Sequence, residues 1–362
     1  MQNTDSSNKI WFESYPPGVL HNINPDQYPS VSELFEEKIK QYASEIAYVN
    51  LGVTMTYQEL EEHSRHFANF LLHHLLLKKG ERVGIMLPNL LQFPVAFFGT
   101  LRAGLITVNI NPLYTPAEIR PIIENSGLET LIVLSPFAHV IERLLATTPI
   151  KNIIITEPTD FFPPVKRVFS SLYLKLLQHD VPSYNIPRAF RFMDALNFGK
   201  TLLFHPIDTQ SHDIALLQYT GGTTGIPKGA VLTHRNLLAN IAQSLTWVSP
   251  IVREKAEIFV TALPLYHIFS LMANLLVPLV LGAKNILITN PRNTKQLIKE
   301  IANVKFTIFT GVNTLFASLL ENPDFPQVNF QSLKLGLSGG MTLQKNVATK
   351  WQNITGKILL EA

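Results

Sequence analysis

The sequence predicts an α/β protein built from two stacked α/β subdomains with mostly parallel sheets. Short, nearly continuous apolar runs alternate with segments of helical period, a pattern typical of parallel strands covered by helices on both faces. The alternation breaks between residues 157 and 212 and then resumes, which indicates two such units. With 362 residues, 46% of them hydrophobic and 16% charged, the chain is long and apolar enough for both cores.

The composition excludes several kinds of site. The chain has no cysteine, so it can form no disulfide, thiolate metal site or cysteine nucleophile. The net charge is +3 without a dense Lys/Arg stripe, so nucleic acid is not an expected partner. Residues Met1–Ile10 are polar and lack the features of a secretory signal. The longest apolar run, Leu271–Ala283, is too short to span a bilayer, so we expect a buried helix there.

The first subdomain is expected over residues 29–212, preceded by a surface arm at 1–28 that is rich in Pro, Asn and Ser. Three helix starts have cap signatures, formed by Ser30 with Glu33, Thr56 with Glu59, and Thr115 with Pro116 and Glu118. Strands are predicted at Ala47–Leu51, Arg82–Leu87, Leu105–Ile110, Leu131–Leu134 and Ile153–Thr156.

An insertion rich in Pro, Phe and Tyr is expected near residues 157–212. Within it, Val165–Leu177 has helical spacing of its apolar residues and three cations elsewhere on its surface. Two interpretations stay open: a weak membrane-surface helix, or an ordinary helix that covers the core. We favour the second, because three cations attract a membrane only modestly.

The second subdomain is expected over residues 213–362. Its predicted strands are Ile214–Gln218, Ile258–Ala262, Asn285–Ile288, Phe306–Phe309, Leu333–Leu337 and Lys357–Leu360. Both halves share the same alternation of strands and helices, without a repeat at the level of residues.

The loop at 219–230, Tyr-Thr-Gly-Gly-Thr-Thr-Gly-Ile-Pro-Lys-Gly-Ala, is the strongest candidate site. Glycines allow close backbone approach, threonine hydroxyls are donors and Lys228 is a mobile cation, which together suit a phosphate. The loop is expected between a strand and a helix, where α/β proteins place ligands. It is neither a Walker loop, because Pro227 precedes the lysine and Gly229 follows it, nor the G-x-G-x-x-G dinucleotide loop.

His267, in the segment Leu263–Phe269 just after a predicted strand, is the second candidate. Its imidazole could hydrogen-bond an anion near neutral pH. A lone histidine is more often structural, but the position of His267 at a strand's end, one strand beyond the loop at 219–230, makes the two roles about equally expected. Thr310–Thr314 could line a pocket, or Asn313 could simply cap a helix. His63 and His66 share a helix face without an acidic partner, so we expect no metal site there.

The segment from Gly336 to Gly340 matches G-x-S-x-G, the nucleophile elbow of hydrolases, with Ser338 as the nucleophile. In that fold an acid and a histidine follow the serine, but no histidine or aspartate follows Ser338 here. We therefore expect Gly339 and Gly340 to serve close approach to a flat ligand such as adenine.

The loop at 219–230 resembles the phosphate-binding signature of the acyl-adenylate-forming (AMP-binding) family. Further segments are similar to the bacterial long-chain fatty acyl-CoA synthetase branch of that family: Trp11–Tyr28, Asn109–Pro116, Leu263–Phe269, Thr310–Phe316 and Ser338–Met341. The resemblance covers essentially the whole chain. It implies the N-terminal domain of an adenylate-forming enzyme, which joins a fatty acid to CoA through an acyl-AMP formed from ATP. It also implies a cytoplasmic protein, with at most peripheral contact at the inner face of the membrane.

The resemblance implies roles for individual residues. Those that would hold the ATP phosphates are Thr220, Gly221, Gly222, Thr223, Thr224, Gly225 and Lys228. His267 would lie beside the reacting carboxylate and α-phosphate, with Thr220 and Lys228 also catalytic. Gly339 and Gly340 would pass along adenine, and Gly311, Val312 and Met341 would border the acyl tunnel. ATP, Mg²⁺ and CoA are the implied cofactors and co-substrates.

The sequence departs from the family at its end, Leu359-Leu360-Glu361-Ala362. The family continues with a glutamate that binds Mg²⁺ and a small C-terminal domain with a catalytic lysine, so we expect an incomplete fold and no metal ligand in this chain. The chain alone is expected to show no ATP–pyrophosphate exchange with palmitate. Two alternatives stay open: a non-catalytic remnant that binds nucleotide or fatty acid, and adenylation of an aryl or amino acid.

Overall fold

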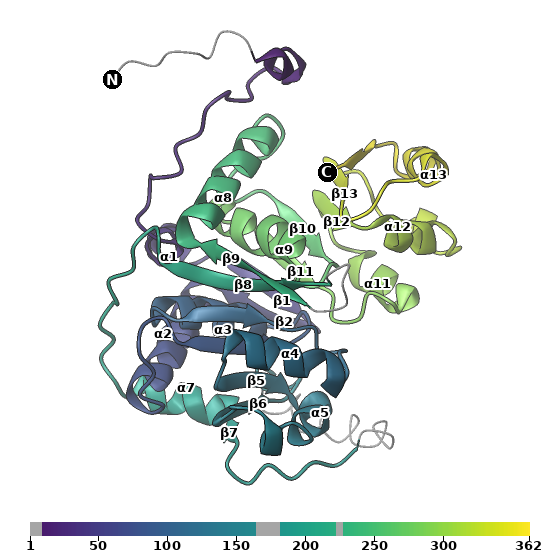
Figure 1. Cartoon of the computed structure of the whole chain (residues 1–362). Coiled ribbons are helices and arrows are strands. Elements are labelled where there is room, and N and C mark those ends of the chain that lie inside the picture. Colours follow the sequence, from purple (N-terminus) through teal and green to yellow (C-terminus); the bar gives the residue numbers. More distant parts are fainter. Residues whose placement is uncertain (1–8, 164–181, 222–226) are drawn as a thin grey trace, which may run out of the picture.

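The computed structural model describes residues 9–163, 182–221 and 227–362, and their strands form two seven-stranded sheets (Figure 1). Sheet A has the order β14 (Leu359–Glu361), β13 (Leu335–Ser338), β12 (Ile308–Gly311), β10 (Ile258–Thr261), β11 (Lys284–Leu287), β1 (Ile46–Asn50) and β2 (Val53–Thr56). Sheet B has the order β7 (Phe190–Arg191), β6 (Asn152–Thr156), β5 (Thr130–Leu134), β3 (Arg82–Met86), β4 (Ile106–Asn109), β8 (Ile214–Thr220) and β9 (Lys228–Thr233). Neighbouring strands are parallel except in the pairs β1–β2 and β8–β9, which confirms two mostly parallel sheets.

The strand pairing departs from the expected division of the chain at residue 213. The early strands β1 and β2 belong to sheet A, where β1 pairs with β11. The later strands β8 and β9 belong to sheet B, where β8 pairs with β4. In Figure 1 the purple β1 and β2 accordingly lie with green and yellow strands. The loop at 219–230, which was expected in the second unit, therefore extends from sheet B. The sequence did not indicate this, because strand pairing depends on contacts between residues that are distant in sequence.

Helices fill the connections, at α1 (Val31–Tyr42), α2 (Tyr57–His73), α3 (Gln92–Arg102), α4 (Pro116–Ser126), α5 (Ala138–Glu142), α7 (Phe192–Lys200), α8 (His234–Val248), α9 (Ile268–Ser270), α10 (Val277–Leu281), α11 (Thr294–Ile301), α12 (Asn313–Leu320) and α13 (Lys345–Thr355). The side chain of Ser30 caps α1, and full capping boxes begin α2 and α4, as their sequences predict. The expected helix at 271–283 is buried, but it begins as a π-helix, Leu271–Leu276, before α10.

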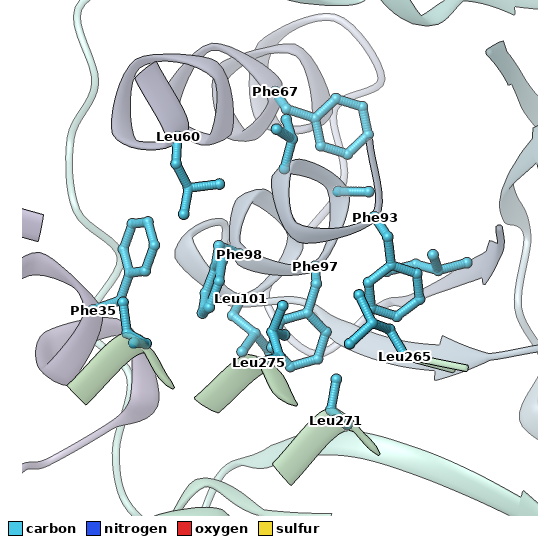
Figure 2. Close-up of a cluster of buried hydrophobic side chains, with 14 of the residues drawn as sticks. Phe35, Leu60, Phe67, Phe93, Phe97, Phe98, Leu101, Leu265, Leu271 and Leu275 are labelled. Atoms are coloured by element: carbon cyan, nitrogen blue, oxygen red, sulfur yellow. The ribbon is translucent and has the colours of Figure 1, made fainter. Parts of the chain in front are cut away.

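One apolar core connects the two layers (Figure 2). Every residue of α3 is buried, and its phenylalanines pack between α2 and the segment that follows β10. Phe98 stacks on Phe35 of α1 with 4.3 Å between ring centroids, while Leu265 and Leu271 reach the same cluster from the sheet A side. This shared core fixes the carboxyl ends of both sheets relative to each other.

The helices of the described residues include none that is both long and apolar enough to cross a membrane. The proposed surface helix Val165–Leu177 lies outside the described residues, so its two interpretations stay predictions.

Candidate functional site

Thr220 and Lys228 are Cα partners at the loop end of the β8–β9 hairpin. The loop was expected to lead into a helix, and this is wrong: it leads into β9, and α8 starts only at His234. Strand β9 was missed because none of its residues is buried, so it shows no buried apolar alternation. Gly222, Thr223, Thr224 and Gly225 lie outside the described residues, so their predicted phosphate contacts stay predictions.

The base of the hairpin is held by Tyr219. Its ring lies beneath Gly229, where an added Cβ would come within 2.9 Å of the ring. Its hydroxyl donates to Asn125 Oδ1 of α4 at 2.6 Å. Gly221, by contrast, faces open space: among the described residues, no heavy atom lies within 4 Å of the place that its Cβ would take. The hairpin is therefore fixed at Tyr219 and has free space at Gly221, which suits a loop that receives a ligand.

The segment Leu263–Phe269, which carries His267, is held by two amide side chains, Asn89 from the loop after β3 and Gln218 from β8. Asn89 donates to the Leu263 carbonyl at 2.9 Å and accepts from the Leu265 amide at 2.8 Å. Gln218 donates to the Tyr266 carbonyl at 3.2 Å. Gln218 lies two residues before Thr220, so both side chains project from the same face of β8. Tyr266, the residue before His267, is therefore bonded to the strand that leads into the phosphate hairpin.

The imidazole of His267 is suited to donate a hydrogen bond. Partial burial lowers its pKa, although the residue is accessible to solvent, and so favours the neutral ring. Its Nδ1 accepts from the Phe269 amide at 3.4 Å. The proton then resides on Nε2, which is free to donate to an anionic oxygen.

The glycine segments of β12 and β13 meet at the same end of sheet A. Gly311 pairs with Ser338, and the Gly339 amide donates to the Gly311 carbonyl at 3.1 Å. An added Cβ on Gly339 would lie 2.8 Å from the ring of Phe269, so this glycine makes room for the His267 segment. Gly340 has φ of +76°, which favours glycine.

The remaining predicted acyl-site residues lie at this edge as well. Val312 Cγ1 is 3.8 Å from the position of a Cβ on Gly340, and Met341 is 48% exposed. Asn313 does not cap its own helix, which was one expectation: its Oδ1 accepts from the Gln344 amide at the start of α13. Ser338 is fully buried, which does not suit a nucleophile presented at an exposed turn.

A pocket of about 440 Å³ opens beside the His267 segment and was not identified from the sequence. It is formed by loops that follow β3, β4, β5, β10 and β11, and each loop contributes a proline: Pro88, Pro112, Pro136, Pro264 and Pro291. Tyr266 and Arg292 add a phenol and a guanidinium to a mainly apolar wall. A proline shortly after each apolar strand is the sequence signal that could have indicated these loops.

His63 and His66 are partly or fully buried in helix α2. Burial lowers the pKa of His63, whose ring lies 5.0 Å from that of Phe161, and it lowers the pKa of His66 to about 4. Across the described ranges no group of three or more His, Asp or Glu side chains is arranged to hold a metal.

The chain is similar to known proteins over nearly its whole length. Residues 35–362 match the family described as AMP-binding enzyme. Over 353 residues the chain is 47% identical to a long-chain-fatty-acid–CoA ligase of Salmonella typhimurium (strain LT2), and over 357 residues it is 31% identical to one of Bacillus subtilis (strain 168). Each match covers 98% of this chain but 63% of the relative's length.

Solved structures share the fold. The anthranilate CoA ligase AuaEII, in complex with anthranoyl-AMP, superposes with a TM-score of 0.79 at 23% identity, covering 93% of this chain and 60% of that one. A long-chain-fatty-acid-CoA ligase from Archaeoglobus fulgidus gives 0.74 at 19% identity, covering 95% and 64%. At these identities the likeness concerns the architecture of the two sheets.

Proposed function

The chain belongs to the AMP-binding enzyme family, and we propose that it carries the adenylating part of a long-chain fatty acid–CoA ligase. In this reaction a fatty acid carboxylate attacks the α-phosphorus of ATP, pyrophosphate leaves, and the thiol of CoA then displaces AMP to form the thioester. The observation that carries the proposal is the 47% identity to such a ligase across 98% of the chain. The substrates are proposals, because the chain spans 63% of that relative's length.

Bringing a carboxylate to a triphosphate requires positive charge and hydrogen-bond donors, since both reactants are anions. The hairpin offers these in Lys228 and Thr220, which are cross-strand partners with exposed positions. We assign both to the ATP phosphates, together with Gly221 and the loop residues 222–225. Mg²⁺ bound to ATP would add further positive charge.

His267 is assigned to the reacting centre. Its Nε2–H can donate to the carboxylate or to an α-phosphate oxygen, while Nδ1 is engaged by the Phe269 amide. Gly339 and Gly340 are assigned to adenine, because they carry no side chains and lie at the end of β13 beside the His267 segment, where Gly340 is exposed. Gly311, Val312 and Met341 are assigned to the acyl chain, which would leave the site along the end of β12.

We assign the proline-lined pocket to CoA. It adjoins Tyr266, so a thiol extended through it would approach the centre that His267 faces. Its apolar wall suits a pantetheine arm, and Arg292 at its rim suits a phosphate.

The test is equilibrium binding of non-hydrolysable adenylate mimics to the 362-residue chain. A hexadecanoyl-adenylate mimic is expected to bind at least about tenfold more tightly than its benzoyl and aminoacyl counterparts, because its chain would bury further apolar surface. Preference for the benzoyl or aminoacyl mimic would instead indicate adenylation of an aryl or amino acid. If the chain binds palmitate but none of the adenylate mimics, it is a fatty acid-binding protein and the proposal is overturned.

A further inference from the structure

A buried chain of hydrogen bonds runs from β12 to the segment that carries His267. Thr310 Oγ1 donates to Asn274 Oδ1 at 2.9 Å, Asn274 Nδ2 donates to Ser270 Oγ at 3.0 Å, and Ser270 Oγ donates to the Leu263 carbonyl at 2.8 Å. The chain has a single direction, because it ends on the Leu263 carbonyl, which can only accept a hydrogen bond. Asn274 and Ser270 are fully buried and Thr310 is 1% exposed.

The two ends of this chain lie at different parts of the site. Thr310 directly precedes Gly311, which we assign to the acyl side. Leu263 opens the His267 segment, and Ser270 closes it one residue after Phe269. The polar chain therefore connects the end of β12 with both ends of the backbone stretch on which His267 lies.

The link passes through the π-helix Leu271–Leu276, which contains Asn274. Such π-helical turns are rare and occur frequently at functional sites. The neighbours of Asn274 in this helix include Leu271 and Leu275, both fully buried in the apolar core (Figure 2). An apolar side chain at position 274 would pack in this core without needing hydrogen-bond partners. A buried amide is tolerated only when its polar atoms are hydrogen-bonded. Stability alone therefore gives little reason for three linked polar groups here.

We propose that Thr310, Asn274 and Ser270 are positioning residues that tie the acyl side of the site to the backbone holding His267. They touch no reacting atom. They keep the Leu263 carbonyl and Ser270, the last residue of α9, in place, and through the Phe269 amide they keep Nδ1 of His267 engaged so that Nε2 carries the proton. The naming of an acyl side rests on the proposed function, whereas the tie itself rests only on the hydrogen bonds.

The direct test is the ring ¹⁵N spectrum of His267 in the unliganded chain, with the signal assigned from His267→Gln. Thr310→Val keeps the shape of the side chain but removes the donor to Asn274, so we expect the His267 signals to move toward a mixture of the two tautomers. Thr310→Ser keeps the hydroxyl and should retain the wild-type signals. Ser270→Ala removes the last donor and should act like Thr310→Val.

Thr130→Val is the matched control. Thr130 is also 1% exposed, and its Oγ1 is bonded to an asparagine, Asn152, at 3.1 Å, but on β5 of sheet B. It should lower the melting temperature without moving the His267 signals. Unchanged His267 signals in folded Thr310→Val and Ser270→Ala would overturn the proposal. So would loss of folding in both of them while Thr130→Val folds, because the chain would then serve stability.

A second measurement separates this inference from the proposed function. In Thr310→Val, the hexadecanoyl-adenylate mimic should bind about tenfold more weakly while AMP binding is unchanged, because small misplacements at a site are costly. If the wild-type chain binds neither ligand, the proposed function fails, and the ¹⁵N spectra still decide whether the three residues position His267. Equal weakening for the mimic and AMP would contradict a tie to the acyl side.

Discussion

Thr220 and Lys228 face each other across the two strands of the β8–β9 hairpin, as the last residue of β8 and the first of β9. Directly opposed residues of an antiparallel pair project to the same face. The hydroxyl and the ammonium group therefore extend to one side of the hairpin. Gln218, on that same face of β8, holds the Tyr266 carbonyl, which places the phosphate hairpin beside the His267 segment of sheet A.

Arg102 is a buried ionic link between three helices, and its loss should destabilise the fold. Its Nη2 lies 2.7 Å from Glu36 and 2.8 Å from Glu61, and its side chain is 2% exposed. Arg102→Met would remove the ion-pair partner of Glu36 and leave Glu61 with Arg65 alone, so we expect the free energy of unfolding to fall by about 3 kcal/mol. Urea denaturation measures this.

The matched control for that experiment is Arg120→Met. Arg120 is 39% exposed and lies 3.8 Å from Glu124 on the same helix. A surface pair of this kind contributes little, so a loss below about 1 kcal/mol is expected. Equal losses in the two variants would contradict the role given to Arg102.

Gly339 is expected to tolerate no side chain. In Gly339→Ala the new Cβ would lie 2.8 Å from the Phe269 ring, so the ring and the His267 segment must shift. Such overpacking costs roughly 1 to 3 kcal/mol and should lower the melting temperature of the unliganded chain. Gly221→Ala meets no atom of the described residues within 4 Å and should leave the melting temperature nearly unchanged. A normal melting temperature for Gly339→Ala would show that this packing is not tight.

Stability should fall in mild acid because of buried histidines. Burial lowers the pKa of His234 to about 4 from its ordinary value of 6.5, and its Nδ1 accepts from the Val31 amide at 3.1 Å. The stabilisation is full above pH 6.5 and is lost as the pH falls toward 4, since only the unfolded chain gains the proton in this range. The loss amounts to roughly 2 to 4 kcal/mol.

Unfolding at a series of pH values between about 7 and 4 tests this prediction. His234→Gln should flatten the dependence, whereas His205→Gln, at an exposed residue, should leave it unchanged. The burial of His66 also lowers its pKa to about 4, so a residual slope is expected in His234→Gln. An identical slope in wild type and His234→Gln would contradict the assignment.

The elements of the fold were largely predictable because their signals are local. Apolar runs located the central strands of both sheets, and the cap at Ser30 and the box at Thr56 located two helix starts. The allocation of strands to sheets was not predictable, because β1 pairs with β11, which lies more than two hundred residues later in the sequence. Strand β9 was missed because it is an exposed edge strand.

The site was predictable where a motif was unusual in itself. The loop at 219–230 and the segments around His267 and Gly339 were each identified from their residues. In the structure Gln218 of β8 bonds to the Tyr266 carbonyl, and Gly339 lies against Phe269. The polar connections were not predictable, because Asn89, Gln218 and Asn274 are single amides without a motif. Their roles follow from partners that lie 36 to 176 residues away.

We assign the β8–β9 hairpin to the phosphates of ATP. Calorimetric titration of ATP with Mg²⁺ into the 362-residue chain and into its Lys228→Ala variant tests this assignment directly. A charge-assisted bond to phosphate contributes about 1.5 to 3 kcal/mol, so the variant should bind ATP at least about tenfold more weakly. Lys200→Ala, at an exposed lysine in the last turn of α7, should bind as the wild type does. Equal ATP affinity in wild type and Lys228→Ala would contradict the role given to the hairpin.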